Sequence, residues 1–199
     1  MNTRLTIPLF PLRTVLFPQG PLPLRIFETR YLDMISRCMR DETPFGVVLI
    51  SRGSEAGPAE FHDVGTLAEI VDWYQGSDGV LGVTATGKER FRVLDCEVAT
   101  DGLNFAAIEI LPSFAASPLP PAYGFLADIL KGVLDDLGRL YESYERRYED
   151  AGWVGCRLAE ILPIKPEDKQ RCLEIDDAIE RLEIIRGMIQ TVRGEISDG

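Results

Sequence analysis

A proline-rich stretch near the middle of the chain is the feature that most constrains its fold. Residues 112–121 contain four prolines among small residues, and because proline fixes φ and lacks an amide hydrogen, no strand or helix can continue through them. Apolar runs separated by glycine precede this stretch, and apolar residues at helical spacing follow it. We therefore predict two units, residues 1–112 and 118–199, with 113–117 as the linker inside the proline-rich stretch that extends to residue 121. We expect the two units to fold together, because each alone is close to the smallest size that supports a stable core.

The first predicted unit has the pattern of an antiparallel β-structure. Its expected strands are residues 45–50, 64–73, 80–85, 90–94 and 105–111. Ser77-Asp78-Gly79, Gly87-Lys88 and Asp101-Gly102 are the expected turns between them. One helix over residues 28–40 places Tyr31, Met34, Ile35 and Cys38 on a single apolar stripe. Strands at this spacing favour a closed or nearly closed antiparallel barrel.

The second predicted unit has the pattern of a helical bundle. Helices are expected over residues 123–148 and 153–162, with Gly152 as a C-cap between them. A third begins at Pro166, and a fourth follows Asp176 as its N-cap. The fold class predicted for the whole chain is therefore α+β.

Composition excludes several classes of function. The formal net charge of −11 opposes general affinity for nucleic acid or for an anionic membrane. No apolar stretch is long enough to cross a bilayer. The four cysteines lack C-x-x-C spacing and His62 is the only histidine, so we expect no metal site and no cofactor. Scattered free thiols suit a reducing compartment, and we expect the chain to be cytoplasmic.

The sequence contains one partial motif for nucleotide binding. Residues 82–88 have the spacing G-x-x-x-x-G-K, but Glu89 stands where the motif needs a serine or threonine for magnesium. The following segment has the pattern of a strand, whereas a phosphate loop leads into a helix. Because a single histidine also leaves no complete nucleophile–base set, we predict no catalytic residues and no enzyme activity. A hydrolase remains a third alternative.

Several segments of the sequence resemble the N-terminal substrate-binding domain of the Lon protease family. The first is Ile7-Pro8-Leu9-Phe10-Pro11-Leu12, which continues through Phe17-Pro18-Gln19-Gly20 to Tyr31. The others are Pro44-Phe45-Gly46, Val64-Gly65-Thr66-Leu67-Ala68, Gly87-Lys88-Glu89-Arg90-Phe91 and Trp153-Val154-Gly155-Cys156. The sequence departs from the family at Gln19, where the family often has glycine directly after the proline.

The resemblance implies a PUA-like β pseudo-barrel followed by a helical bundle. It also implies a non-catalytic module that recognises unfolded or extended polypeptide segments, without the ATPase and protease modules of the family. The alternative is an RNA- or nucleotide-binding PUA-like module, which only the six arginines among residues 1–40 support. A database label of peptidase would describe the family rather than this polypeptide.

Four residues are predicted to bind peptide because the fold does not need them: Arg13, Phe17, Trp73 and Tyr74. The two neighbouring aromatic residues end a predicted strand, where they can serve as exposed anchors. The apolar residues of the opening segment, Phe17 and Phe27 among them, are more often core than contact residues. Arg25, Glu28 and Arg30 are expected to tie the first helix to the barrel.

Overall fold

The computed structural model describes residues 5–55, 57, 59–76, 80–137, 141 and 145–197, with side chains described as far as residue 190. Its contacts divide the chain into two compact units, Met1–Ser113 and Phe114–Gly199. The first contains a mixed sheet with one helix, and the second contains helices, which confirms the predicted α+β class. That residues 1–112 and residues 118–199 depend on each other for their stability stays a prediction.

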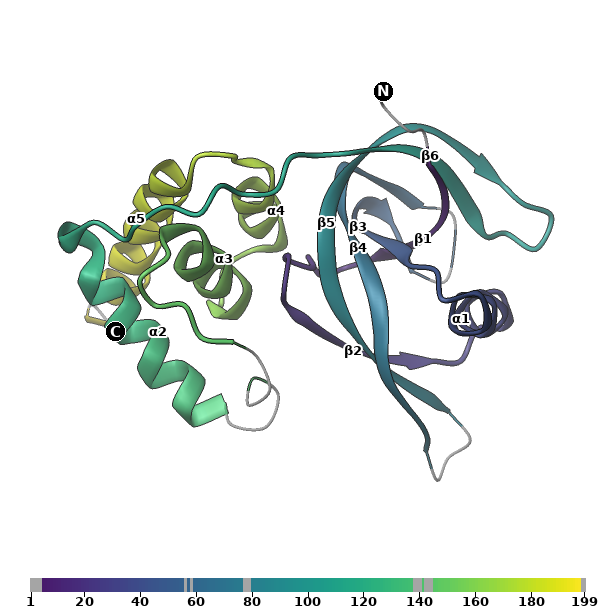
Figure 1. Cartoon of the computed structure of the whole chain (residues 1–199), viewed down its shortest axis with the longest axis horizontal. Helices are drawn as coiled ribbons and strands as arrows, with labels where there is room; N and C mark the ends of the chain where they lie inside the picture. Colours follow the sequence, from purple (N-terminus) through teal and green to yellow (C-terminus); the bar gives the residue numbers. More distant parts are fainter. Residues whose placement is uncertain are drawn as a thin grey trace. The chain divides into compact units, whose positions relative to one another are not determined.

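The first unit is built on six strands and one α-helix within the described residues (Figure 1). The strands are β1 (Leu5–Leu12), β2 (Pro21–Ile26), β3 (Phe45–Gly53), β4 (Ala59–Gln75), β5 (Leu81–Val98) and β6 (Asn104–Ile110). The helix α1 (Thr29–Asp41) lies between β2 and β3 in the sequence. The strand order in the sheet is β2-β5-β4-β3-β1-β6.

The sheet closes into a ring because β6 pairs with β1 on one side and with β5 on the other. β5 is long enough to pair with two strands along the same edge: its first part pairs with β2 and its second part pairs with β6. The ring is not the antiparallel barrel that the sequence predicts, since β1 and β3 are parallel. A parallel pair needs a crossover connection, and the segment that contains β2 and α1 supplies it.

β5 is one continuous strand, so the predicted turn at Gly87-Lys88 is wrong. Gly87 instead allows a close approach, since a Cβ there would lie 2.1 Å from the carbonyl oxygen of Phe17. Arg90 of the same strand is buried, and its Nη2 donates to the carbonyl of Pro112 at 3.1 Å. Gln19 has φ 62°, a left-handed conformation that favours glycine, which accounts for the glycine common after this proline in the family.

The phenyl group of Phe91 lies in the interior of the ring of strands and has no exposed surface. A Cβ on either Gly46 of β3 or Gly65 of β4 would lie 2.8 Å from Cζ of Phe91. A Cβ on Gly65 would also lie 2.3 Å from the carbonyl oxygen of Val47. The buried residues that complete this core are Ile7, Leu9, Val48, Leu67, Ala106 and Ile108.

A second core lies between α1 and the sheet. Tyr31, Met34, Ile35 and Cys38 are all buried, as the apolar stripe predicts. The ring of Tyr31 stacks on Phe10 of β1 with 4.0 Å between the ring centroids. Phe27 was expected in the core but is 72% exposed, because it follows the last residue of β2.

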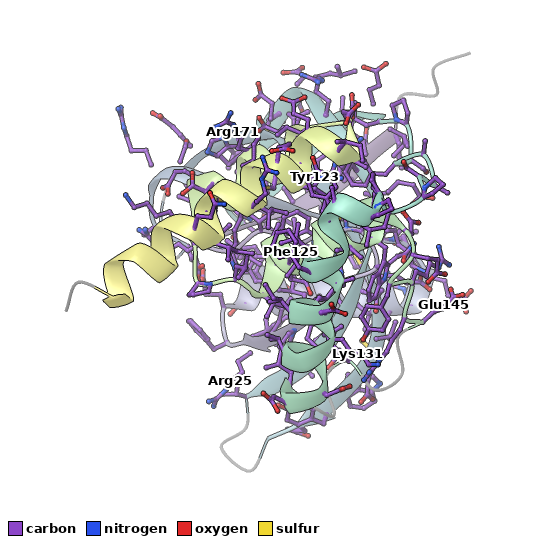
Figure 2. The ribbon with its side chains drawn as sticks, turned by 90° about the vertical axis from the view of Figure 1, so that its left-hand side faces the viewer. Arg25, Tyr123, Phe125, Lys131, Glu145 and Arg171 are labelled. Atoms are coloured by element: carbon purple, nitrogen blue, oxygen red, sulfur yellow. The ribbon has the colours of Figure 1, made fainter. Side chains whose placement is uncertain are left out.

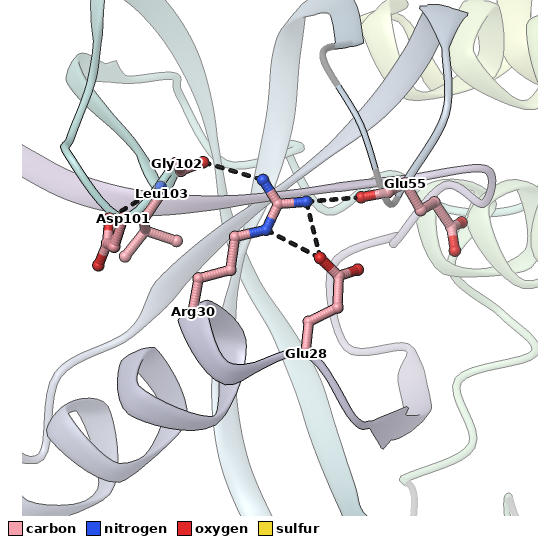
Figure 3. Close-up of polar contacts among 6 residues, drawn as sticks. All are labelled: Glu28, Arg30, Glu55, Asp101, Gly102 and Leu103. Carbon is pink, nitrogen blue, oxygen red and sulfur yellow. Dashed lines mark hydrogen bonds and ion pairs between the residues drawn. The ribbon is translucent and has the colours of Figure 1, made fainter.

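Arg30 fixes the beginning of α1 to two distant loops (Figure 3). Its Nε donates to the Glu28 carboxylate at 3.0 Å. Its two terminal nitrogens donate to the carbonyls of Gly102 and Glu55, each at 2.9 Å. Arg30 therefore ties the beginning of α1 to two loops of the first unit, as predicted, whereas Glu28 orients Arg30 from the same segment; the predicted role of Arg25 stays a prediction.

The second unit contains a short 3-10 helix (Pro121–Tyr123) followed by α2 (Gly124–Leu137), α3 (Ala151–Ile161), α4 (Pro166–Glu174) and α5 (Ala178–Ser197). Figure 2 shows Tyr123 just before α2, Phe125 at the beginning of α2 and Lys131 farther along it. Among the described residues, no helix is both long and apolar enough to span a bilayer.

Three predicted helix limits are wrong. α2 ends at Leu137 instead of continuing to residue 148; residues 145–147 are not helical, and residues 138–140 and 142–144 lie outside the described part. Gly152 is the second residue of α3 and not a C-cap, because the Asp150 carboxylate caps this helix by accepting the amides of Gly152 and Trp153. At α5, Asp177 accepts the amides of residues 179 and 180, so it and not Asp176 is the cap.

The bundle contains a buried ion pair within α3. Nη2 of Arg157 lies 3.0 Å from Oε2 of Glu160, and both side chains are almost inaccessible. Tyr141 donates its hydroxyl to the same carboxylate, and Nζ of Lys169 donates to the Glu160 carbonyl at 2.6 Å. Burial raises the pKa of Glu160, and the charge of Arg157 opposes that shift.

We expect Gly65→Ala to lower the free energy of unfolding by about 3 kcal/mol, because its Cβ collides with both a carbonyl and the Phe91 ring. The matched control is Gly132→Ala on α2, where a Cβ meets nothing within 4 Å. That change should stabilise the helix by up to about 1 kcal/mol. Urea unfolding measures both, and equal stability of the two variants would contradict the packing described for Phe91.

We expect Arg157→Leu to lower the free energy of unfolding by about 3 kcal/mol at neutral pH, because Glu160 is left buried without its cation. Arg146→Leu is the control, since its 2.6 Å pair with Asp135 is solvent-exposed and contributes less than about 1 kcal/mol.

The deficit of Arg157→Leu should shrink in acid. The folded pKa of Glu160 is already raised, and losing Arg157 raises it further. The folded variant therefore binds the proton more tightly than the unfolded chain does. The loss of unfolding free energy is therefore complete at pH values above the raised pKa of Glu160 in the folded variant. It becomes smaller as the pH falls toward the ordinary glutamate pKa of about 4. A deficit independent of pH in urea unfolding would show that Glu160 is not its cause.

Candidate functional site

The first unit contains a groove of about 780 Å³ between the end of α1 and β4. One wall comes from the last turn of α1 and the segment that leads into β3, and the other comes from β4 with two residues of β5. The lining residues are Cys38, Met39, Glu42, Thr43, Pro44, Leu67, Glu69, Ile70, Val71, Asp72, Trp73, Lys88 and Glu89.

Apolar side chains in this groove are accessible to solvent. Val71 and Trp73 are each 55% exposed. Met39 and Ile70 are half-buried, and both pack against the core beneath α1. A largely exposed tryptophan beside a hollow is a suitable anchor for an apolar ligand group.

One edge of β4 is open along the groove. The last pair between β3 and β4 is Phe45 with Ala68, and Pro44 precedes this pair. In the part of the chain that the structure describes, residues 69–75 pair only with β5. The pairing with β5 shifts register between Ile70 and Asp72, so Val71 is the extra residue of a bulge.

The groove carries more negative than positive charge. Its carboxylates are Glu42, Glu69, Asp72 and Glu89. Its lysine, Lys88, lies 2.5 Å from the Glu69 carboxylate, so this positive charge already has a partner. Oδ1 of Asp72 accepts the N–H of Trp73 at 2.8 Å, which places the Asp72 carboxylate against the strand backbone.

The structure does not bring the four predicted binding residues together. Trp73 lines the groove, whereas the ring of Tyr74 lies over Gly82, where a Cβ would meet it at 2.2 Å. Consecutive strand residues point to opposite faces, so the adjacent aromatic residues face different ways. Tyr74 is nevertheless 58% exposed.

The other two predicted residues lie outside the groove. Arg13 is exposed, but its side chain is held in place, since Nη2 donates to the carbonyl of Gly53 at 2.7 Å. Its backbone N–H donates to the Glu55 carboxylate. Phe17 is completely buried, which contradicts its prediction as a contact residue and agrees with the core position expected for most of the opening segment. Sequence reasoning missed the groove, although its predicted strands of unequal length, 45–50 and 64–73, already implied an unpaired end.

The residues of the groove are better suited to binding a ligand than to catalysis or metal coordination. The segment Gly82–Lys88 lies within strand β5 and does not form a phosphate loop at a helix N-terminus. Among the described residues, no three histidine, cysteine, aspartate or glutamate side chains are grouped so that they could hold a metal ion. The side chains in the groove can offer apolar contact, carboxylates and an open strand edge.

Comparisons with known proteins agree with this architecture. The chain is 35% identical to a Lon N-terminal domain protein from Xanthomonas campestris, over 92% of this chain and 98% of that one, with a TM-score of 0.77. The N-terminal domain of a Lon protease from the Mycobacterium avium complex shares the fold, with a TM-score of 0.62 at 15% identity over 90% of this chain and 95% of that one.

Full-length relatives are much longer than this chain. It is 25% identical to the Lon protease of Haemophilus influenzae over 96% of its own length, and 30% identical to that of Paraburkholderia phytofirmans over 93%. In each case it spans 24% of the relative. The family model of the ATP-dependent protease La (LON) substrate-binding domain matches residues 6–191, and the chain belongs to this family.

Proposed function

We propose that this chain is a non-catalytic module that binds unfolded or extended polypeptide segments. The observation that carries the proposal is the groove in which Val71 and Trp73 remain exposed beside an open strand edge. Unfolded polypeptides expose apolar side chains, and a groove with a half-exposed tryptophan can cover them. Membership of a substrate-binding domain family supports the same assignment.

The alternative, an RNA- or nucleotide-binding module, is less well supported by the groove. Binding of a phosphate backbone needs unpaired cations, but the groove presents four carboxylates and a lysine that is already paired with Glu69. Arg13 and Arg30, which belong to the basic N-terminal set, use their guanidinium groups in hydrogen bonds within the unit. The net charge of −11 acts in the same direction.

The cysteines support a reducing, cytoplasmic location. Cys38, Cys96, Cys156 and Cys172 form no disulfide bond in the described part of the chain. Burial raises the pKa of Cys172 to about 11, so its thiol stays protonated at neutral pH.

The purified chain should hydrolyse neither ATP nor a fluorescent casein substrate above background. The physical reason for the absence of ATP turnover is that Lys88 lies within strand β5 and pairs with Glu69, whereas a phosphate loop leads into the N-terminus of a helix. ATP turnover that disappears in Lys88→Ala, with the variant still folded, would contradict the non-catalytic assignment.

Trp73→Ala should weaken binding of reduced, alkylated lysozyme about tenfold in titration calorimetry. Burial of an aromatic side chain contributes about 1.5–3 kcal/mol, and the indole is already partly buried in the free chain. Folded lysozyme has a similar charge but hides its apolar residues, and it should not bind.

Phe125→Ala is the matched control for Trp73→Ala. Phe125 is also a partly exposed aromatic residue, at 41%, but it lies on α2 of the second unit (Figure 2). Its removal should leave the affinity unchanged. An equal loss in both variants would mean that the groove is not the binding site, and binding of single-stranded RNA but not of unfolded lysozyme would favour the alternative.

A further inference from the structure

We propose that the open edge of β4 accepts an extended polypeptide segment as an additional strand, and that the segment it prefers alternates apolar and basic side chains. This inference rests on the proposed polypeptide-binding function. It adds to that function the mode of binding and the chemistry of the segment that is bound.

The backbone of β4 supplies the first part of the evidence. The edge of a strand carries N–H and C=O groups that can pair with another chain. In the described part of the chain, residues 69–75 pair with β5 on one side only, because β3 begins at Phe45 opposite Ala68. The groove lies where β3 would continue, since Glu42, Thr43 and Pro44 line it together with Glu69 to Trp73. Residues 69–75 offer an edge of roughly 20 Å.

The side chains beside this edge supply the second part. Val71 and Trp73 are each 55% exposed on β4, and Met39 stands on the opposite wall of the groove. Successive residues of an added strand point to opposite faces. Every second side chain of the bound segment would therefore meet apolar surface, which favours residues such as valine at those positions.

The charges of the groove decide between basic and acidic segments. Lys88 already pairs with Glu69, which leaves Glu42, Asp72 and Glu89 without a cation among the groove residues. The Asp72 carboxylate lies against the Trp73 amide, beside the backbone that an added strand would follow. Lysine or arginine side chains at the alternate positions complement these carboxylates, and acidic ones are repelled.

The mode of binding is tested with a capped peptide of about ten residues in which valine and lysine alternate. Two further peptides carry N-methyl groups on all valine amides or on all lysine amides. Because the amides of consecutive residues point to opposite edges of a strand, all valine amides lie on one edge and all lysine amides on the other, so each set of methyl groups blocks a different edge. Titration calorimetry with the full chain should show a loss of at least about tenfold for one set and less than about threefold for the other.

The outcomes separate strand addition from polypeptide binding in general. Equal affinities of the two methylated peptides would overturn strand addition. Strand addition is also overturned if the unmethylated peptide does not bind although unfolded lysozyme does. If unfolded lysozyme then binds Trp73→Ala more weakly than the wild-type chain, the proposed polypeptide-binding function stands. Failure of the peptide and of unfolded lysozyme alike would remove both proposals.

The preference for basic side chains is tested with Asp72→Asn, which keeps an acceptor for the Trp73 amide but removes the charge. The affinity for the valine–lysine peptide should fall about threefold. Asp63→Asn, an exposed change on the same strand but outside the groove, should have no effect. A glutamate version of the peptide should bind more weakly than the lysine version; equal binding of the two would overturn the charge preference. Thermal melting of each variant confirms that it is folded.

Discussion

The packing inside the ring of strands depends on the contact between the Phe91 side chain and two glycines. Phe91 belongs to β5, Gly46 to β3 and Gly65 to β4, so the contact joins three strands at one point. A side chain on either glycine would come closer to the ring than atoms can approach without displacement. Phe91 can therefore fill the interior only because its neighbours have no side chains.

The segments that carry the family resemblance meet each other in the folded chain. Oγ1 of Thr66 donates to the carbonyl of Leu16 at 2.6 Å. The carbonyl of Gly87 accepts the amide of Gln19, and its amide donates to the carbonyl of Gly20. These contacts fix the opening segment against β4 and β5, so the resemblance rests on residues that build the scaffold. The exposed residues of the groove, Val71 and Trp73, lie outside the quoted segments.

Local patterns predicted the elements of this fold better than they predicted its site. The apolar stripe of α1 and most strands follow from periodicity, but the continuity of β5 through Gly87 does not, because a neighbouring backbone requires that glycine. Phe17 and Phe27 look alike in the sequence, yet Phe17, which precedes β2, is buried, and Phe27, which follows the last residue of β2, is exposed. The groove arises from the unequal reach of β3 and β4 and from α1 beside them, which is a property of tertiary structure.

The carboxylates of the groove also bear on how the chain behaves at high concentration. An open strand edge is a template for pairing between identical molecules, and natural proteins protect such edges with charges and bulges. Two copies aligned through β4 would place Glu42, Asp72 and Glu89 of one molecule near the same carboxylates of the other. Like charges facing each other across paired strands are destabilising. The charge that selects a foreign segment therefore also discourages self-association, and neutralising it should make the chain more prone to aggregate.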